Sequence, residues 1–315
     1  MDTVAVRPGA VRPGAAAVCI LGGMFALGIT DNLLPFISET GSLWQFHMLR
    51  GALAVLLLAG IVMMAGRGVI RPVSWRAVLG RSFFPASAML IYFGCLSVLP
   101  IGVVVAGLFT APMFVLLISV VFLHERVGPV RIAAVMMGFI GALLVIQPDP
   151  GALDPVAFLP VVAGMLYAVG AVVTRLWCAG ESTMSLSAGF FGMLALFGAI
   201  GLLIVPTGGP LGFSGFVMRG WVPLTANMMF WIAVQALGSI IGIGLITRGY
   251  LLAEAGFVAV FEYSLLVFAS FWAWVLWDQS VGLPALAGMA LIAGAGAVIT
   301  LRSEAAMPVR AVKVP

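Results

Sequence analysis

A chain of 315 residues that is 63% hydrophobic and only 8% charged is too apolar for a soluble domain, since soluble proteins carry about 25% charged residues. Its net charge of +4 comes from basic residues scattered among the loops, a distribution that argues against a nucleic-acid partner. The apolar runs are continuous and do not alternate as barrel strands do. The predicted fold is therefore all-α and embedded in a lipid bilayer.

Ten apolar stretches are long enough to cross a bilayer, because a spanning helix needs roughly 20 residues. Segment 1–14, which contains AVRPG twice, is predicted to be a disordered cytoplasmic tail, and segment 302–315 a second cytoplasmic tail. The first apolar run is too long for a signal peptide and has no clear cleavage site, so we expect an uncleaved first span. The predicted spans are 15–37, 43–65, 80–98, 101–123, 129–147, 156–177, 185–206, 227–248, 255–277 and 282–301.

The basic residues indicate the orientation of these spans. Apart from Arg50 and Arg219, all of the 15 Lys and Arg residues fall in the tails, in the connecting segments or at the ends of spans on one side, and Arg76 and Arg81 are assigned to a cytoplasmic segment among them. Short loops rich in Lys and Arg remain in the cytoplasm. We therefore expect both termini to be cytoplasmic, in a bacterial-type inner membrane.

The two halves of the chain resemble each other. Residues 100–146 can be placed on 253–299 without a gap, and each half contains five spans, so the second half would enter the membrane from the opposite side. Many carriers are built from such inverted repeats, although any two Gly- and Ala-rich helices match to some degree. The predicted repeats are 15–147 and 156–301. The aligned pairs are Glu125 with Asp278, Met136 with Met289, Gly141 with Gly294, Ala142 with Ala295, and Val145-Ile146 with Val298-Ile299.

Glycines are prominent in the fifth and tenth spans. Gly138 and Gly141 in the fifth span, and Gly288 and Gly294 in the tenth, would allow helix backbones to approach closely. Small residues favour helix contact in lipid, where no hydrophobic drive exists between helices. We assign these two helices a scaffold role or a contact in a homodimer.

Ionisable side chains inside spans are costly and mark candidate functional sites. Asp31 in the first span and Arg50 in the second are each roughly 10 Å below the outer surface, at 1.5 Å rise per residue. His47 shares a helical face with Arg50. These residues form either a salt bridge that closes the outer vestibule or a site for an anionic group of a substrate.

Glu262 is the third charged candidate. It lies in the ninth span between Phe261 and Tyr263, whose rings would line a pocket. A carboxylate at that depth binds a proton or a cationic substrate, or else it is a hydrogen-bonded carboxyl that locks two helices together. Neutral hydrogen-bonding groups from five spans would complete a central site with apolar walls. These groups are Tyr92, Thr110, Tyr167, Gln235 and Tyr263.

Catalytic signatures are missing from the sequence. It contains no HExxH, GxSxG or GxxxxGKS motif, and its three cysteines show no CxxC spacing. We therefore predict no enzyme activity, no catalytic residues, no metal and no cofactor. Without a nucleotide site, transport would be driven by a gradient.

Four motifs resemble the drug/metabolite transporter superfamily, specifically its EamA-type ten-helix members, over residues 15–301. They are Phe46-x-x-x-Arg50, the segment Phe122 to Val127, Gly138-x-x-Gly141, and Phe261-Glu262-Tyr263. The resemblance implies a secondary carrier that moves a small amphipathic metabolite by alternating access. Efflux of amino-acid-like compounds is the default for the family, while uptake of S-adenosylmethionine or riboflavin is typical of a bacterial subgroup. A membrane scaffold that transports nothing is the remaining alternative.

Overall fold

The computed structural model describes residues 12–65, 72–96, 99, 101–125, 127–148, 155–209 and 215–305. Most of the predicted N-terminal tail, the tail beyond residue 305, Arg67, Arg71 and Arg126 lie outside these residues. The described part is entirely helical, and ten of its helical segments are long and apolar enough to cross a membrane. The predicted fold class is therefore confirmed for this part of the chain.

Helix bounds differ from the predicted spans mainly at the ends. α13 continues to Ala305, past the predicted end at 301, and α4 begins at Trp75 and not at 80. The helices are α1 (Pro13–Asn32), α2 (Pro35–Ser38), α3 (Leu43–Ala65), α4 (Trp75–Leu96), α5 (Ile101–Leu108), α6 (Ala111–Val121), α7 (Pro129–Ile146), α8 (Leu159–Trp177, after the 3-10 turn Pro155–Phe158), α9 (Thr183–Ile204), α10 (Ala226–Leu252), α11 (Ala255–Glu262), α12 (Ser264–Trp277) and α13 (Leu283–Ala305).

Local sequence sets where several helices begin. The side chain of Ser182 accepts a hydrogen bond from the backbone N–H of Ser185, and that of Thr225 accepts one from Met228. Such caps satisfy backbone donors that the first helical turn leaves free. Proline opens α7, where its missing N–H costs no hydrogen bond.

Two spans are broken near their middle. The fourth span consists of α5 and α6, separated at Phe109 and Thr110, and the ninth consists of α11 and α12, separated at Tyr263. The hydroxyl of Thr110 donates to the carbonyl of Gly107 at 2.6 Å and so satisfies a backbone acceptor at the break. Both breaks lie beside the site described below.

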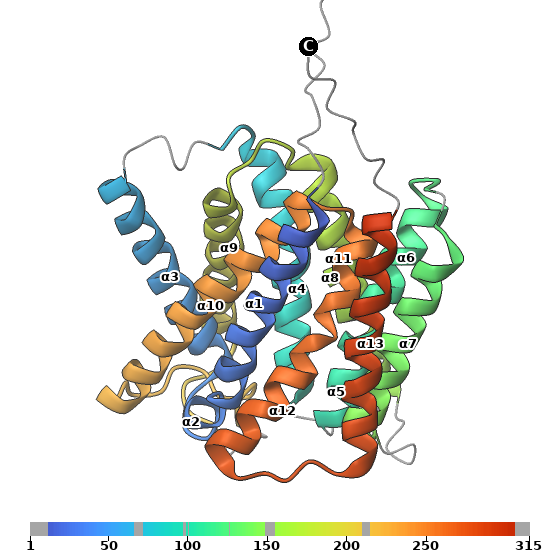
Figure 1. Cartoon of the computed structure of the whole chain (residues 1–315). Coiled ribbons are helices and arrows are strands. Elements are labelled where there is room, and N and C mark those ends of the chain that lie inside the picture. Colours follow the sequence, from blue (N-terminus) through green and yellow to red (C-terminus); the bar gives the residue numbers. More distant parts are fainter. Residues whose placement is uncertain are drawn as a thin grey trace, which may run out of the picture.

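The helices pack in pairs of segments that are distant in sequence: α1 with α10, α3 with α9, α4 with α8, and α7 with α13. α3 and α9 form one side of the bundle, while α7 and α13 form the other (Figure 1). The start of α1 and the end of α13 lie at the same end, and α2 and the end of α12 lie at the opposite end. The largest apolar core joins residues of α1, α6, α8 and α11.

Candidate functional site

A cavity of about 740 Å³ lies between the two halves of the bundle. It begins at the end of the bundle near α2, where Glu39 and Gln279 line it, and reaches Tyr167 and Glu262 in mid-bundle. Its walls are mostly apolar, and its polar groups are few, which is the usual make-up of a small-molecule site. The predicted candidates Asp31, Arg50, Tyr92, Tyr167 and Glu262 all line it.

Arg50 is the cation that lines the cavity in the described part of the chain. Its guanidinium lies 4.5 Å from the centre of the Phe46 ring, and its Nη1 donates to Ser239 Oγ at 3.4 Å. Its Nη2 lies 3.4 Å from Nδ1 of His47, while its Nε is buried without a hydrogen-bond partner. These bonds are long, so the guanidinium retains capacity to bind an anionic group.

Asp31 does not pair directly with Arg50. The two groups attract each other electrostatically, but no ion pair within 4.0 Å joins them in the part of the chain that the structure describes. The salt bridge considered above is therefore not formed in this conformation. Asp31 is exposed to the cavity, and His47 lies behind Arg50, fully buried against the ring of Phe93.

Glu262 is at the deep end of the cavity, at the last residue of α11. Only 5% of it is exposed, and its Oε1 accepts a hydrogen bond from the hydroxyl of Tyr167 at 2.9 Å. Tyr250 also interacts with this carboxyl. No Lys or Arg of the described chain pairs with Glu262, so its charge is compensated only by hydroxyl groups at short range.

Besides His47, three other predicted site residues do not line the cavity. Thr110 bonds to its own helix at the break, and Gln235 Nε2 donates to the carbonyl of Thr30 at 2.6 Å. Tyr263 is fully buried, stacked on Phe109 and packed against Gly138. Depth in the membrane alone did not distinguish these residues from those that face the cavity.

The prediction for Arg81 was wrong. It was assigned to a cytoplasmic segment, but α4 begins at Trp75, so Arg81 is inside the helix and only 6% exposed. Its Nε donates to Thr174 Oγ1 at 2.7 Å. Tyr250, which interacts with Glu262, was also not among the predicted site residues. The apolar run that follows Arg81 in the sequence could have indicated that this arginine lies inside the helix.

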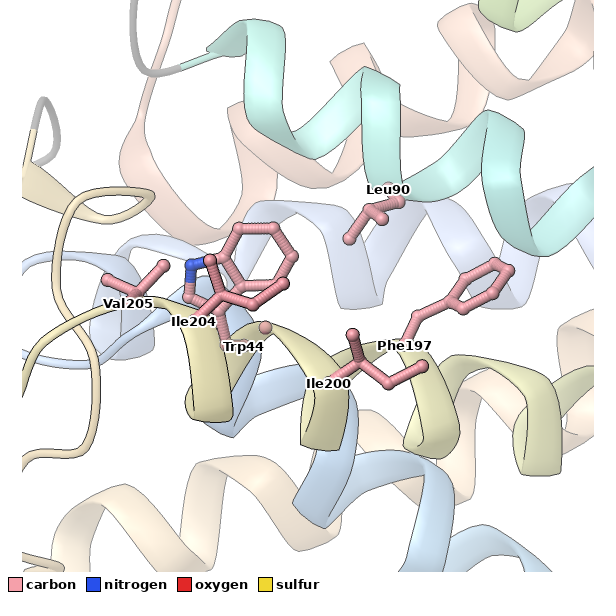
Figure 2. Close-up of a pocket in the computed structure, with 7 residues that line it drawn as sticks. Trp44, Leu90, Phe197, Ile200, Ile204 and Val205 are labelled. Atoms are coloured by element: carbon pink, nitrogen blue, oxygen red, sulfur yellow. The ribbon is translucent and has the colours of Figure 1, made fainter.

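A second pocket, of about 240 Å³, lies between α3, α4 and α9. Figure 2 shows the Trp44 ring beside Ile204, with Leu90 and Phe197 further along. Its walls are aliphatic and aromatic, and Trp44 directs its N–H away to the carbonyl of Val217 at 2.8 Å. It offers no charged group for recognition, so the larger cavity is the candidate site.

Comparisons with known proteins relate the chain to membrane transporters. Residues 14–147 match the model of the EamA-like transporter family. A riboflavin transporter of Rhizobium johnstonii is 28% identical over 74% of this chain and 78% of its own length, and one of Brucella anthropi is 26% identical over 80% and 84%. The pseudopaline exporter CntI of Pseudomonas aeruginosa is 25% identical over 85% and 89%.

A solved structure described only as a crystal structure of a protein has a TM-score of 0.65 to this chain. It is 23% identical and covers 94% of this chain and 98% of its own, so it establishes the fold alone. The family match, the relatives named as transporters and the ten spanning helices point to transport and not to catalysis. The chain is therefore a multi-pass membrane protein that is similar to the EamA-like transporter family over residues 14–147.

Proposed function

We propose that the protein is a gradient-driven carrier that moves a small amphipathic metabolite by alternating access around the central cavity. The observation that carries the proposal is the cavity itself, which joins Arg50 and Glu262 in one space of about 740 Å³. Ligand pockets commonly measure about 300–1,000 Å³. A scaffold would instead bury these two charges in helix contacts without a cavity between them.

Riboflavin or a compound like it is the first substrate candidate. Two of the relatives reported above are named riboflavin transporters, and the cavity presents aromatic rings to a flat ligand. Stacking on such rings is favourable beyond the area that it buries. The rings that line the cavity and keep accessible surface are those of Phe36, Tyr92 and Trp277.

An amino-acid-like compound is the second candidate, and export is its expected direction. Arg50 would bind the carboxylate of such a compound, and Asp31 or Glu262 its cationic group, since all three side chains line the cavity. The relative named as a pseudopaline exporter supports export within this family. Glu262 is also the group that would bind a coupling proton.

Two inverted repeats would supply the two gates. The pairing of residues 100–146 with 253–299 places Thr110 on Tyr263, and both spans break at these residues. α7 and α13, which correspond in this pairing, pack against each other through Gly141 and Gly288. This contact supports a scaffold role for the two helices, and a homodimer would use their outer faces.

Counterflow in proteoliposomes tests the proposed function. Vesicles loaded with unlabelled riboflavin should take up labelled riboflavin saturably, with S-adenosylmethionine and a panel of amino acids run in parallel. Glu262→Gln should abolish the dependence of this exchange on pH if Glu262 carries the coupling proton. Folded protein that exchanges none of these compounds would contradict the proposed substrate classes, and unchanged pH dependence in the variant would exclude Glu262 as the coupling group.

A further inference from the structure

Arg81, Thr174 and Thr247 form a buried cluster outside the cavity, here called the Arg81 cluster. The guanidinium Nε of Arg81 donates to Thr174 at 2.7 Å and its Nη2 to Thr247 at 3.4 Å, while its Nη1 is buried without a hydrogen-bond partner. No carboxylate of the described chain lies within 4.0 Å of Arg81. An ionisable side chain inside a span marks a candidate functional site, and the unused donors of Nη1 suit an anionic ligand.

The helical faces that line the cavity continue to the Arg81 cluster. The arginine precedes Tyr92 on α4 by eleven residues, or about three turns, and the α8 threonine follows Tyr167 by seven, or about two turns. The α10 threonine follows Ile243 by four residues and shares its face. All three reference residues line the cavity. The backbone N–H of Arg12, just before α1, donates to Leu252 at the end of α10, so the cluster lies towards the end of the bundle where α1 starts.

Arg50 is held in a similar way from the opposite end. Its Nη1 donates to Ser239 on α10 at 3.4 Å, and its Nε has no hydrogen-bond partner. Arg50 is the eighth residue of α3 and Arg81 the seventh of α4. Consecutive spans run in opposite directions, so each guanidinium is roughly 10 Å from its own end of the bundle. Their hydroxyl partners Ser239 and Thr247 are eight residues apart on α10, or roughly 12 Å.

We propose that Arg81 binds the anionic group of the substrate, a carboxylate in the amino-acid-like class, when the site opens towards the end where α1 starts. In the described conformation Arg50 lines the cavity and Arg81 is covered. When the cavity closes near α2 and opens at the other end, the carboxylate leaves Arg50 and accepts hydrogen bonds from Arg81. This inference rests on the proposed function and deepens it, since it assigns a second binding residue for the same substrate.

Side-specific kinetics test this role of Arg81. The half-saturation concentrations of labelled phenylalanine and S-adenosylmethionine, which both carry a carboxylate, are measured at each face in right-side-out and inside-out vesicles. We expect Arg81→Gln to raise this concentration about tenfold at the face where α1 starts, as the loss of one charged hydrogen bond implies, with a smaller effect at the α2 face. Arg50→Gln should show the reverse asymmetry. Equal effects of Arg81→Gln at both faces, or none, would overturn the proposal.

Two further variants separate anion binding from a loss of structure. Arg81→Lys keeps the charge but not the planar guanidinium, so it should show the same asymmetry at a smaller size, and it replaces Arg81→Gln if that variant does not fold. Arg131→Gln is the matched control, because it makes the same change in charge but breaks an ion pair with Glu254 at 2.6 Å. It should leave both half-saturation concentrations unchanged.

Cysteine labelling tests the opening without a transport measurement. With the native cysteines replaced by serine, Thr247→Cys should react with an impermeant maleimide in inside-out vesicles. Ala142→Cys is the control, since Ala142 is as fully buried as Thr247 but packs with Ile292 of α13, and it should not react. Thr247→Cys that is unreactive at both faces would overturn the proposal and leave the carrier standing if substrate is exchanged. A reactive Thr247→Cys without exchange of either compound would support the opening and contradict the proposed amino-acid-like substrates.

Discussion

At the scale of single residues, the rarity of charge inside the spans was informative. Asp31, Arg50 and Glu262 were singled out only because ionisable groups inside a membrane need a partner or water, and all three line the cavity. Arg81 was overlooked because it was the second residue of the predicted span 80–98 and was counted with the cytoplasmic segment, whereas α4 begins five residues earlier, at Trp75. Charge inside a span therefore located the site, while the error in one boundary concealed a fourth charge.

Transport should depend on the planar shape of the Arg50 guanidinium and not only on its positive charge. Its guanidinium stacks on Phe46 at 4.5 Å and reaches Ser239 and His47 at once, which a lysine ammonium does not reproduce. We expect Arg50→Gln to lower counterflow at least about tenfold, as the loss of one charged hydrogen bond implies. Arg50→Lys should be intermediate.

The control for Arg50 is Arg219→Gln. Arg219 lies outside the cavity and donates to the carbonyls of Ser38 and Glu39 at 2.7 and 2.8 Å. This variant should lower thermal stability and leave the exchange per folded molecule unchanged. Equal exchange by Arg50→Gln and wild type would argue against substrate contact at Arg50.

At the scale of helices, ten spans were predicted, and Pro112 indicated a bend in the middle of the fourth, but the break in the ninth span was not predicted. A hydropathy window averages over about 19 residues, so a one-residue interruption such as that at Tyr263 leaves no trace in it. The break at Thr110 has a local cause in Pro112, which has no N–H to continue the helical hydrogen bonds, and the Thr110 hydroxyl satisfies the carbonyl of Gly107 there. The break in the ninth span contains neither Gly nor Pro, so the sequence offered no breaking residue there.

Close contact between α3 and α9 predicts that alanine substitutions at two glycines of α9 change the unfolding free energy differently. A Cβ at Gly198 would collide with the backbone of Trp44 and Met48, which cannot rotate away. Gly198→Ala should therefore cost ~1–3 kcal/mol in unfolding free energy. At Gly192 the nearest atom to an added Cβ belongs to Val55 at 4.0 Å.

Gly192→Ala serves as the matched control, because it introduces the same methyl group into the same helix. It should be neutral or stabilising by up to about 1 kcal/mol, since alanine favours a helix over glycine. Thermal unfolding of the two variants in detergent compares them directly. Equal stability of both would mean that α3 and α9 are less closely packed than described.

At the scale of the molecule, the cavity extends to the end of the bundle that carries α2 and the loop after α12. The distribution of Lys and Arg predicts that this end faces outwards. The described conformation would then have its candidate site accessible from the outside.

Cysteine labelling in intact cells tests this orientation. Ser280→Cys, exposed after α12, should react with an impermeant maleimide, whereas Val73→Cys, exposed before α4, should react only after permeabilisation. Background from Cys178 should be small, because burial raises the pKa of its thiol to about 11 and leaves little thiolate at neutral pH. The reverse pattern would refute the predicted topology.

The sequence by itself determined that this protein is a ten-span helical membrane protein with a few charges at depth. These properties follow from local composition, because a bilayer requires roughly 20 apolar residues per span and penalises each buried charge. Only the tertiary structure decided that Tyr167 reaches Glu262 across 95 residues of chain, that Asp31 and Arg50 stay apart, and that Arg81 is buried against Thr174 and Thr247. Such contacts depend on how each helix is rotated and packed, which no local pattern specifies.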